Sequence, residues 1–184
     1  MANNELSGPT VVSFLADWIR QAPRKYTYRF IFIPETIGSI TYISWHLDTL
    51  KRNVMAGFNI ICVGDDRAYT LIHSRYGATF AAKVMECVLT ARHPKFNNCS
   101  YFQRGSDERQ YCGPKVDLPL VGFSRSLYTT YPKYHTSLDN LDMVSATGLL
   151  GSLNVLRDCV ELIERNERNQ VQCQGEPQLG ERGL

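Results

Sequence analysis

Apolar residues recur every three or four positions in four stretches of this chain, the spacing of a helix that buries one face. The first stretch begins at Pro9, which suits the first turn of a helix. The other three cover residues 40–50, 78–91 and about 140–165. The positions expected to face the core include Val11, Phe14, Leu15, Trp18, Ile19, Ile40, Ile43, Leu47, Leu50, Ala81, Val84, Met85, Val88, Leu149, Leu153, Leu156, Val160 and Ile163.

Short apolar runs lie between the predicted helices. Residues 28–33 and 58–63 are continuous runs, typical of strands covered on both faces. Shorter strands are predicted at 69–73, 101–102 and 118–123. The alternation predicts a three-layer α/β/α sandwich with a mostly parallel mixed sheet. We expect one domain over residues 1–170 and a linker-like tail over residues 171–184, with no internal repeat.

Composition narrows the classes of protein. The chain of 184 residues is 43% apolar, enough for a packed core. A formal net charge of +2 argues against a nucleic-acid groove. The chain has neither an apolar stretch that could span a membrane nor a signal peptide, so a cytoplasmic location is the default. Its six cysteines form no Cys-x-x-Cys pair and fit that compartment as reduced thiols.

Residues that could bind a metal ion or transfer a proton are found near the ends of the expected strands. His135 lies between a polar loop and the last helix, where a metal ligand or proton shuttle would be placed. Glu35 follows the run 28–33, and Asp65 follows the run 58–63. In open α/β sheets, ligands bind beyond the carboxyl ends of the strands. These three side chains therefore indicate a site at one edge of the sheet.

Three motifs resemble those of a known family. They are Glu35-Thr36-Ile37-Gly38-Ser39, Gly105-Ser106-Asp107 and Tyr134-His135-Thr136-Ser137-Leu138-Asp139. In this order they resemble zinc-dependent aminopeptidases of the bacterial leucyl aminopeptidase type. The sequence is most similar to a bacterial branch described as aminopeptidase-like proteins of polysaccharide biosynthesis, over almost the whole chain.

The resemblance implies roles for four residues. His135 matches the final ligand histidine, and Asn4 takes the place of a metal-bridging aspartate. Aligned on Gly38, Glu35 takes the position of the general base; an alignment on the preceding strand instead makes it a metal ligand. Asp65 is the carboxylate nearest to a further ligand position. With these replacements we expect one zinc ion at most, in a zinc-exopeptidase-like fold.

The resemblance also implies that this chain is a fragment. The family's first ligand histidine is expected upstream of the loop at residues 2–8, in a stretch that the chain does not contain. Members of the related branch also continue into a winged-helix module after the final linker. A sheet that lacks a flanking strand has an open edge, so we expect the isolated chain to dimerise or aggregate.

Each residue also has a structural interpretation. Glu35 could cap the helix that starts near Gly38. Asp65 could form a turn with an ion pair, and Asp107 could order its own loop. A lone histidine such as His135 is more often structural than a ligand.

Three functions remain open. The first is a zinc-dependent exopeptidase that hydrolyses a terminal amide bond of a small peptide through a metal-activated water, with Glu35 as base. The second is an inactive peptidase-like binding scaffold. The third is an amidohydrolase that acts on an amino-sugar precursor. None of the three implies binding to a membrane or to nucleic acid.

Overall fold

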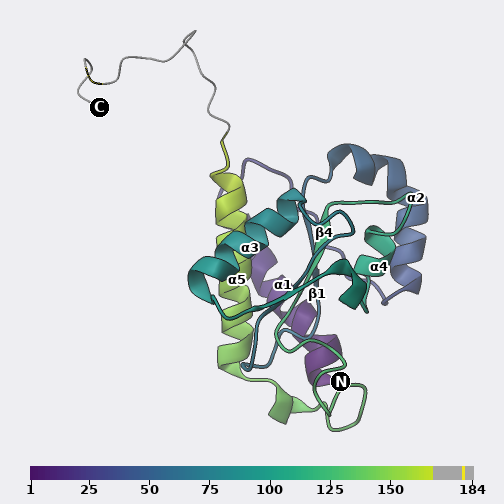
Figure 1. Cartoon of the computed structure of the whole chain (residues 1–184), viewed down its shortest axis with the longest axis vertical. Helices are drawn as coiled ribbons and strands as arrows, with labels where there is room; N and C mark the ends of the chain where they lie inside the picture. Colours follow the sequence, from purple (N-terminus) through teal and green to yellow (C-terminus); the bar gives the residue numbers. More distant parts are fainter. Residues whose placement is uncertain (168–179, 181–184) are drawn as a thin grey trace.

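The fold is built on a four-stranded mixed sheet. The computed structural model describes residues 1–167 and Gly180. Its strands are β1 (Gly57–Ile60), β2 (Thr70–Ile72), β3 (Asn97–Cys99) and β4 (Leu120–Ser124), in the order β1-β4-β2-β3 (Figure 1). β1 is parallel to β4 and β2 is parallel to β3, whereas β2 and β4 are antiparallel. The chain therefore has an α/β fold, and β1 lies at one edge of the sheet.

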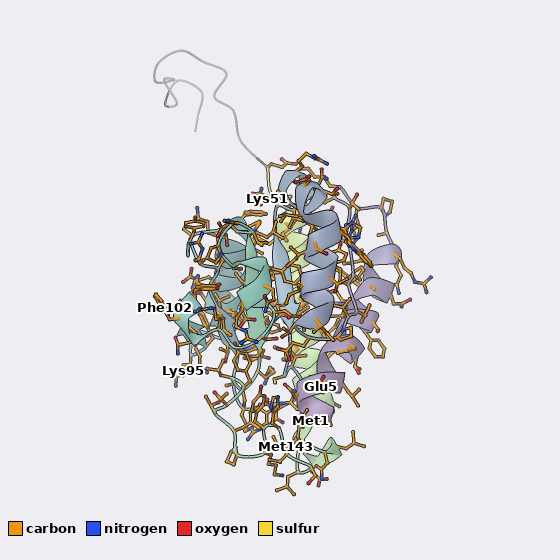
Figure 2. All side chains as sticks on the ribbon, turned by 90° about the vertical axis from the view of Figure 1, so that its right-hand side faces the viewer. Met1, Glu5, Lys51, Lys95, Phe102 and Met143 are labelled. Carbon is orange, nitrogen blue, oxygen red and sulfur yellow. The ribbon has the colours of Figure 1, made fainter. Side chains whose placement is uncertain are left out.

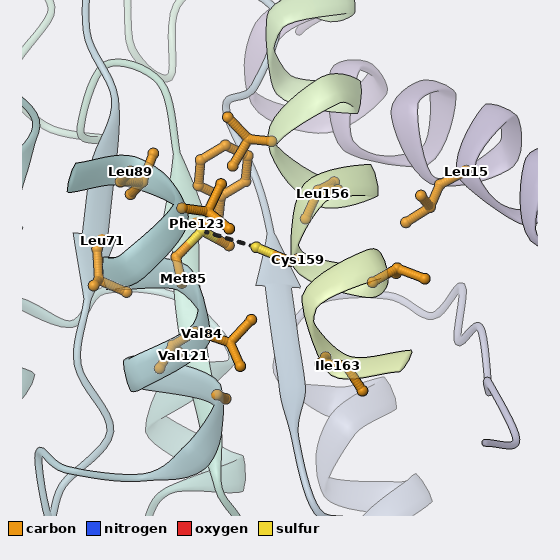
Figure 3. Close-up of a cluster of buried hydrophobic side chains, with 14 of the residues drawn as sticks. Leu15, Leu71, Val84, Met85, Leu89, Val121, Phe123, Leu156, Cys159 and Ile163 are labelled. Atoms are coloured by element: carbon orange, nitrogen blue, oxygen red, sulfur yellow. Dashed lines mark hydrogen bonds between the residues drawn. The ribbon is translucent and has the colours of Figure 1, made fainter. Parts of the chain in front are cut away.

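Three helices form the main core with one face of this sheet. They are α1 (Ser7–Arg20), α3 (Phe80–Arg92) and α5 (Ala146–Glu164). Figure 3 shows Leu15 of α1 facing Leu156 of α5, and Met85 of α3 beside Cys159. Val121 and Phe123 of β4 are fully buried in the same cluster. Because alternate side chains of a strand point to opposite faces, these two define the face that the three helices cover.

A smaller core contains α2 (Ile37–Asn53) and the short α4 (Glu108–Tyr111). Ile43 and Leu50 of α2 pack with Tyr111 and Leu118, and Leu120 at the start of β4 joins them. Leu120 alternates with Val121 along β4, so it points away from the main core. Two clusters thus hold the central strand β4.

Three further short elements complete the described chain. A π-helix, η1 (Ala2–Leu6), leads directly into α1. The 3₁₀ turns η2 (Tyr101–Gln103) and η3 (Leu141–Met143) follow β3 and precede α5. A third cluster, which includes Cys62, Tyr128, Tyr131 and Met143, packs between the end of β1 and the loop before α5.

The four predicted helices are confirmed, although their first and last residues differ from the predicted ones. The four predicted helices correspond to α1, α2, α3 and α5, although α5 begins at Ala146 rather than near Asn140. Phe14 and Ile40 were expected to face the core, but their side chains are 63% and 50% exposed. Among the strands, 58–63, 69–73 and 118–123 correspond to β1, β2 and β4.

Two strand predictions are wrong. Tyr101 and Phe102 lie in the 3₁₀ turn η2, and the strand in that region is β3, three residues earlier. Residues 28–33 form no strand, because no backbone hydrogen bond joins them to a neighbour in the described part of the chain. Their apolar run has the composition of a strand but lacks a partner strand to pair with.

Two predictions from composition can be compared with the described residues. No helix among them is long and apolar enough to cross a membrane. Their five cysteines are free, which agrees with the expected reduced thiols. The predicted tail at residues 171–184 lies outside the described residues apart from Gly180, so the expected domain boundary stays a prediction.

Candidate functional site

The candidate site lies where the N-terminal segment meets the ends of β1 and β4. Met1, Glu5 and Met143 gather at one end of the molecule, opposite Lys51 (Figure 2). Asn3 accepts a hydrogen bond from the N–H of Gly64 through its side-chain oxygen (2.8 Å). Ser7 accepts one from the N–H of Val63 (2.9 Å). The N-terminal segment therefore covers the carboxyl end of β1, the end of the sheet predicted from sequence.

Asp139 anchors the N-terminal segment through hydrogen bonds. Its side chain is 3% exposed and accepts hydrogen bonds from the N–H groups of Asn3 (2.8 Å) and Asn4 (3.0 Å). Its backbone oxygen accepts a third from the N–H of Ala2 (2.8 Å). The first N–H groups of a helix have no intrahelical partner, and a carboxylate satisfies them well. Asp139 thus fixes the position of Asn4.

Asp65 joins three segments. Its carboxylate accepts hydrogen bonds from the hydroxyl (2.8 Å) and N–H (3.1 Å) of Ser126, and from the amide of Asn3 (3.2 Å). It also accepts one from the N–H of Arg67 (3.1 Å), whose guanidinium lies 3.4 Å away. Asp65 therefore forms the turn and ion pair of its structural interpretation. Its metal-binding role stays a prediction.

Asn4 and Cys62 form a buried pair. The Cys62 thiol donates to the side-chain oxygen of Asn4 (3.3 Å), while the Asn4 amide donates to Glu5 (2.7 Å). Cys62 is fully buried, and its thiol also lies 3.6 Å from the hydroxyl of Tyr131. Burial raises the pKa of the Cys62 thiol to about 12, so the thiol stays protonated near neutral pH. Cys62 is a hydrogen-bond donor rather than a nucleophile.

Glu35 lies in the turn before α2, which is fixed to the loop before α4. The N–H of Thr36 donates to the carboxylate of Asp107 (2.8 Å), and Thr36 has a positive φ of 62°. Thr36 is the N-cap of α2, and no side chain caps it, so Glu35 does not act as a capping residue. Its carboxylate is exposed and lines the same groove as Asn4 and Asp107. Glu35 is thus available to solvent or to a ligand.

His135 is exposed and lies against Tyr134. Their rings stack with centroids 3.9 Å apart, and His135 has a positive φ of 56°. Burial raises the pKa of the Tyr134 hydroxyl. That His135 and Glu35 share one site stays a prediction.

These side chains do not form a metal centre by themselves. Within residues 1–167, no group of three or more His, Cys, Asp or Glu side chains could hold a metal ion. Zinc sites need about three protein ligands. Asp65 is committed to hydrogen bonds, and the oxygen of Asn4 is occupied by a thiol. The donor set described here does not fit zinc without a further ligand.

The sequence did not single out Glu108, which is fully buried behind the site. Its carboxylate accepts hydrogen bonds from the N–H groups of Gly105 (2.8 Å) and Ser106 (3.0 Å), and from the hydroxyl of Tyr128 (2.7 Å). Asn59 of β1 donates to its other oxygen (2.8 Å). Glu108 thereby holds the loop of Asp107 against the sheet. Glu108 stands in a polar loop, and nothing in the sequence around it indicates that its side chain is buried.

Comparison with known proteins places the chain in a family. Residues 1–166 match the family model described as a domain of unknown function, DUF4910. The chain belongs to the DUF4910 family. A relative from Clostridium acetobutylicum, named as a candidate polysaccharide biosynthesis protein with an aminopeptidase-like domain, is 37% identical over the whole chain. This member of the DUF4910 family spans only 42% of that relative.

Solved structures show the same fold. A crystal structure of a candidate peptidase from Clostridium acetobutylicum, 37% identical, superposes with a TM-score of 0.89 over the whole chain and 43% of its own length. An aminopeptidase from Aneurinibacillus gives 0.76 at 20% identity, over 96% of this chain and 43% of its own. A zinc aminopeptidase from Bacillus subtilis gives 0.71 at 21% identity, over 91% and 43%. This DUF4910 chain is therefore a peptidase-like domain with an aminopeptidase-type fold.

Proposed function

We propose that this chain forms part of an aminopeptidase-like hydrolase that cleaves a terminal amide bond. The observation that supports the proposal best is the groove that Asn4 and Glu35 both line. The names of the Clostridium relative and of the aminopeptidases with this fold point in the same direction. The proposal includes a three-layer α/β/α sandwich and a cytoplasmic location.

In this proposal, Glu35 is the general base. An exposed carboxylate that lines a groove can accept a proton from a water that attacks the substrate carbonyl. The substrate is the end of a small peptide or a related amide. His135 is this chain's contribution to a zinc ligand set, with Asn4 and Asp65 as further candidates. Because the described residues do not fit zinc alone, the 184-residue chain is expected to be inactive as a hydrolase.

A hybrid polypeptide tests the role of Glu35. In it, these 184 residues replace the matching region of the Clostridium acetobutylicum relative. We expect the hybrid to release the chromophore from at least one member of a panel of aminoacyl p-nitroanilides. Glu35→Gln keeps the shape and removes the base, so it should lower the rate by about 100-fold or more. Circular dichroism confirms that both proteins are folded.

The matched control is Glu86→Gln. Glu86 lies on α3, and its carboxylate accepts a hydrogen bond from the side chain of Asn98, outside this site. It should leave the rate unchanged. Equal rates for Glu35→Gln and the unmodified hybrid would contradict the proposed base. Hydrolysis of N-acyl amino sugars, but not of aminoacyl substrates, would instead favour the amidohydrolase.

An inactive binding scaffold is the second candidate. It is favoured by the committed hydrogen bonds of Asp65 and by the thiol on the oxygen of Asn4. A folded hybrid that cleaves no substrate of either panel would favour this scaffold.

A further inference from the structure

A second cavity, of about 810 Å³, lies at the end of the sheet opposite the candidate site. β2 is antiparallel to β4 and parallel to β3, so the carboxyl ends of β2 and β3 lie where β1 and β4 begin. The cavity is lined by residues that follow β2, belong to the start of α3, and lie on or after β3. In open α/β sheets, ligands bind beyond the carboxyl ends of the strands. The unit β2-α3-β3 therefore has a cavity of its own in this position, with a volume typical of small-molecule sites.

This cavity, the β2–β3 pocket, carries an excess of positive charge. Three basic side chains line it, Arg75, Lys83 and Arg104, against one carboxylate, Glu86. Arg75 is paired with Asp117 (2.5 Å). Within the described part of the chain, no carboxylate oxygen lies within 4.0 Å of the charged nitrogens of Lys83 or Arg104. Two basic groups without an ion-pair partner at one cavity favour an anionic ligand.

Aromatic side chains stand beside these charges. The guanidinium of Arg104 lies over the ring of Tyr101 (4.3 Å to the centroid), and that of Arg75 lies over Tyr76 (4.6 Å). The side chain of Phe102 is 89% exposed and points outward in Figure 2. An aromatic ring gains free energy when another ring covers it. A ligand with a flat ring can therefore cover Phe102 while its charged group meets the basic side chains.

Hydrogen bonds fix the walls of the β2–β3 pocket. The ring nitrogens of His73 lie 3.3 Å from the backbone oxygen of Gly77 and 2.6 Å from the side-chain oxygen of Asn98. The amide of Asn98 donates in turn to the carboxylate of Glu86 (3.0 Å). The turn after β2, the strand β3 and the helix α3 are thereby joined around the pocket. Walls that are ordered before binding lose less conformational entropy when a ligand binds.

We propose that the β2–β3 pocket binds a small phosphate monoester that carries a flat ring. A phosphate monoester has a charge of about −1.5 to −2 near neutral pH, which matches two unpaired basic groups better than the single charge of a carboxylate. Arginine binds phosphate through its planar fork and lysine as a point charge, so Arg104 and Lys83 suit the phosphate. The ring is expected to stack on Phe102. Because the pocket lies at the other end of the sheet from the candidate site, this proposal does not depend on hydrolytic activity.

Calorimetric titration of the 184-residue chain with phenyl phosphate tests the proposal. Inorganic phosphate, which lacks the ring, and benzoate, which carries a single negative charge, are the reference ligands. We expect phenyl phosphate to bind about fivefold or more tightly than either of them. Sodium chloride should weaken this binding, because it screens the charges of exposed groups.

Two substitutions locate the bound ligand. Lys83→Ala removes a basic group and Phe102→Ala removes the exposed ring, so each should weaken phenyl phosphate binding by about fivefold or more. Both side chains are exposed, and circular dichroism verifies that the variants are folded. The matched controls are Lys95→Ala, in the turn before β3, and Phe14→Ala, on α1; both side chains are exposed and lie outside the pocket. Neither control should change the affinity.

Three results would overturn the proposal. In the first, phenyl phosphate shows no saturable binding. In the second, inorganic phosphate or benzoate binds as tightly as phenyl phosphate, so that the pocket does not recognise the ring or the second charge. In the third, Lys83→Ala and Phe102→Ala both bind phenyl phosphate as tightly as the unmodified chain, which places the ligand elsewhere.

Discussion

At the scale of single residues, the sequence named candidate positions but not their contacts. Asn4 and Glu35 line one groove, while the place of His135 in the same site stays a prediction. The hydrogen bonds of Asp65 were less predictable, because a carboxylate after a strand can bind a metal or a turn. Asp139 belongs to a motif, but its burial gave no signal, since a polar residue in a polar loop shows no periodicity that reveals burial.

Asp139 should be important for stability because it satisfies two buried N–H groups. Asp139→Ala leaves both without an acceptor and should lower the free energy of unfolding by about 2–4 kcal/mol. Asp142→Ala, on the exposed surface of η3, should change it by less than about 0.5 kcal/mol. Urea denaturation measures both. Equal effects of the two substitutions would contradict the anchoring role.

Because of Cys62, the free energy of unfolding should fall at alkaline pH. Its pKa is raised from 9.0 to about 12 in the folded chain, so the unfolded chain loses the proton first. The folded state is unaffected below pH 9 and loses stability as the pH rises from about 9 towards 12, by at most about 1.4 kcal/mol per pH unit. The urea concentration at the unfolding midpoint should fall less steeply with pH for Cys62→Ala than for the wild type. Identical slopes would mean that Cys62 is not buried as a thiol.

At the scale of elements, amphipathic helices were predictable and strand edges were not. The stripes of α1 and α5 are long enough for periodicity to identify them. β3 was missed because Asn97 and Asn98 give an exposed edge strand the composition of a loop. The prediction of a strand at residues 28–33 was wrong, because strand pairing depends on a neighbouring strand that the sequence of the segment does not encode.

The start of α5 shows how an element positions the site. Gly148 packs so closely that an added Cβ would lie 2.2 Å from the carbonyl of Gly64 and 2.6 Å from that of Asp65. Alanine favours helices over glycine by about 1 kcal/mol, yet here it must push backbone away. Gly148→Ala should therefore destabilise the chain by about 1–3 kcal/mol in thermal or urea unfolding.

Thr147→Ala is the matched control, because Thr147 is an exposed neighbour in the first turn of α5. It should be neutral or slightly stabilising. A Gly148→Ala variant that is as stable as Thr147→Ala would show that α5 does not press against the loop after β1.

At the scale of the whole molecule, the described chain is a peptidase-like unit whose open sheet ends in β1 at one edge and β3 at the other. The sequence predicted the α/β class and the end of the sheet where polar groups meet. It could not predict the groove beside β1, which depends on the packing of α1, α5 and segment 26–34. Self-association of the isolated chain through an unpaired edge strand stays a prediction, which light scattering tests.

We propose that His135 and Glu35 belong to one hydrolytic site that the 184 residues do not complete alone. The most direct test of this proposal is the zinc content of the hybrid polypeptide, measured by mass spectrometry after extensive dialysis. We expect about one zinc ion per hybrid, background zinc in the 184-residue chain, and background zinc in the hybrid with His135→Ala. His46→Ala, on α2, should retain the metal. Unchanged zinc in His135→Ala, or a full equivalent of zinc in the 184-residue chain, would contradict the proposed role of His135 in a shared zinc site.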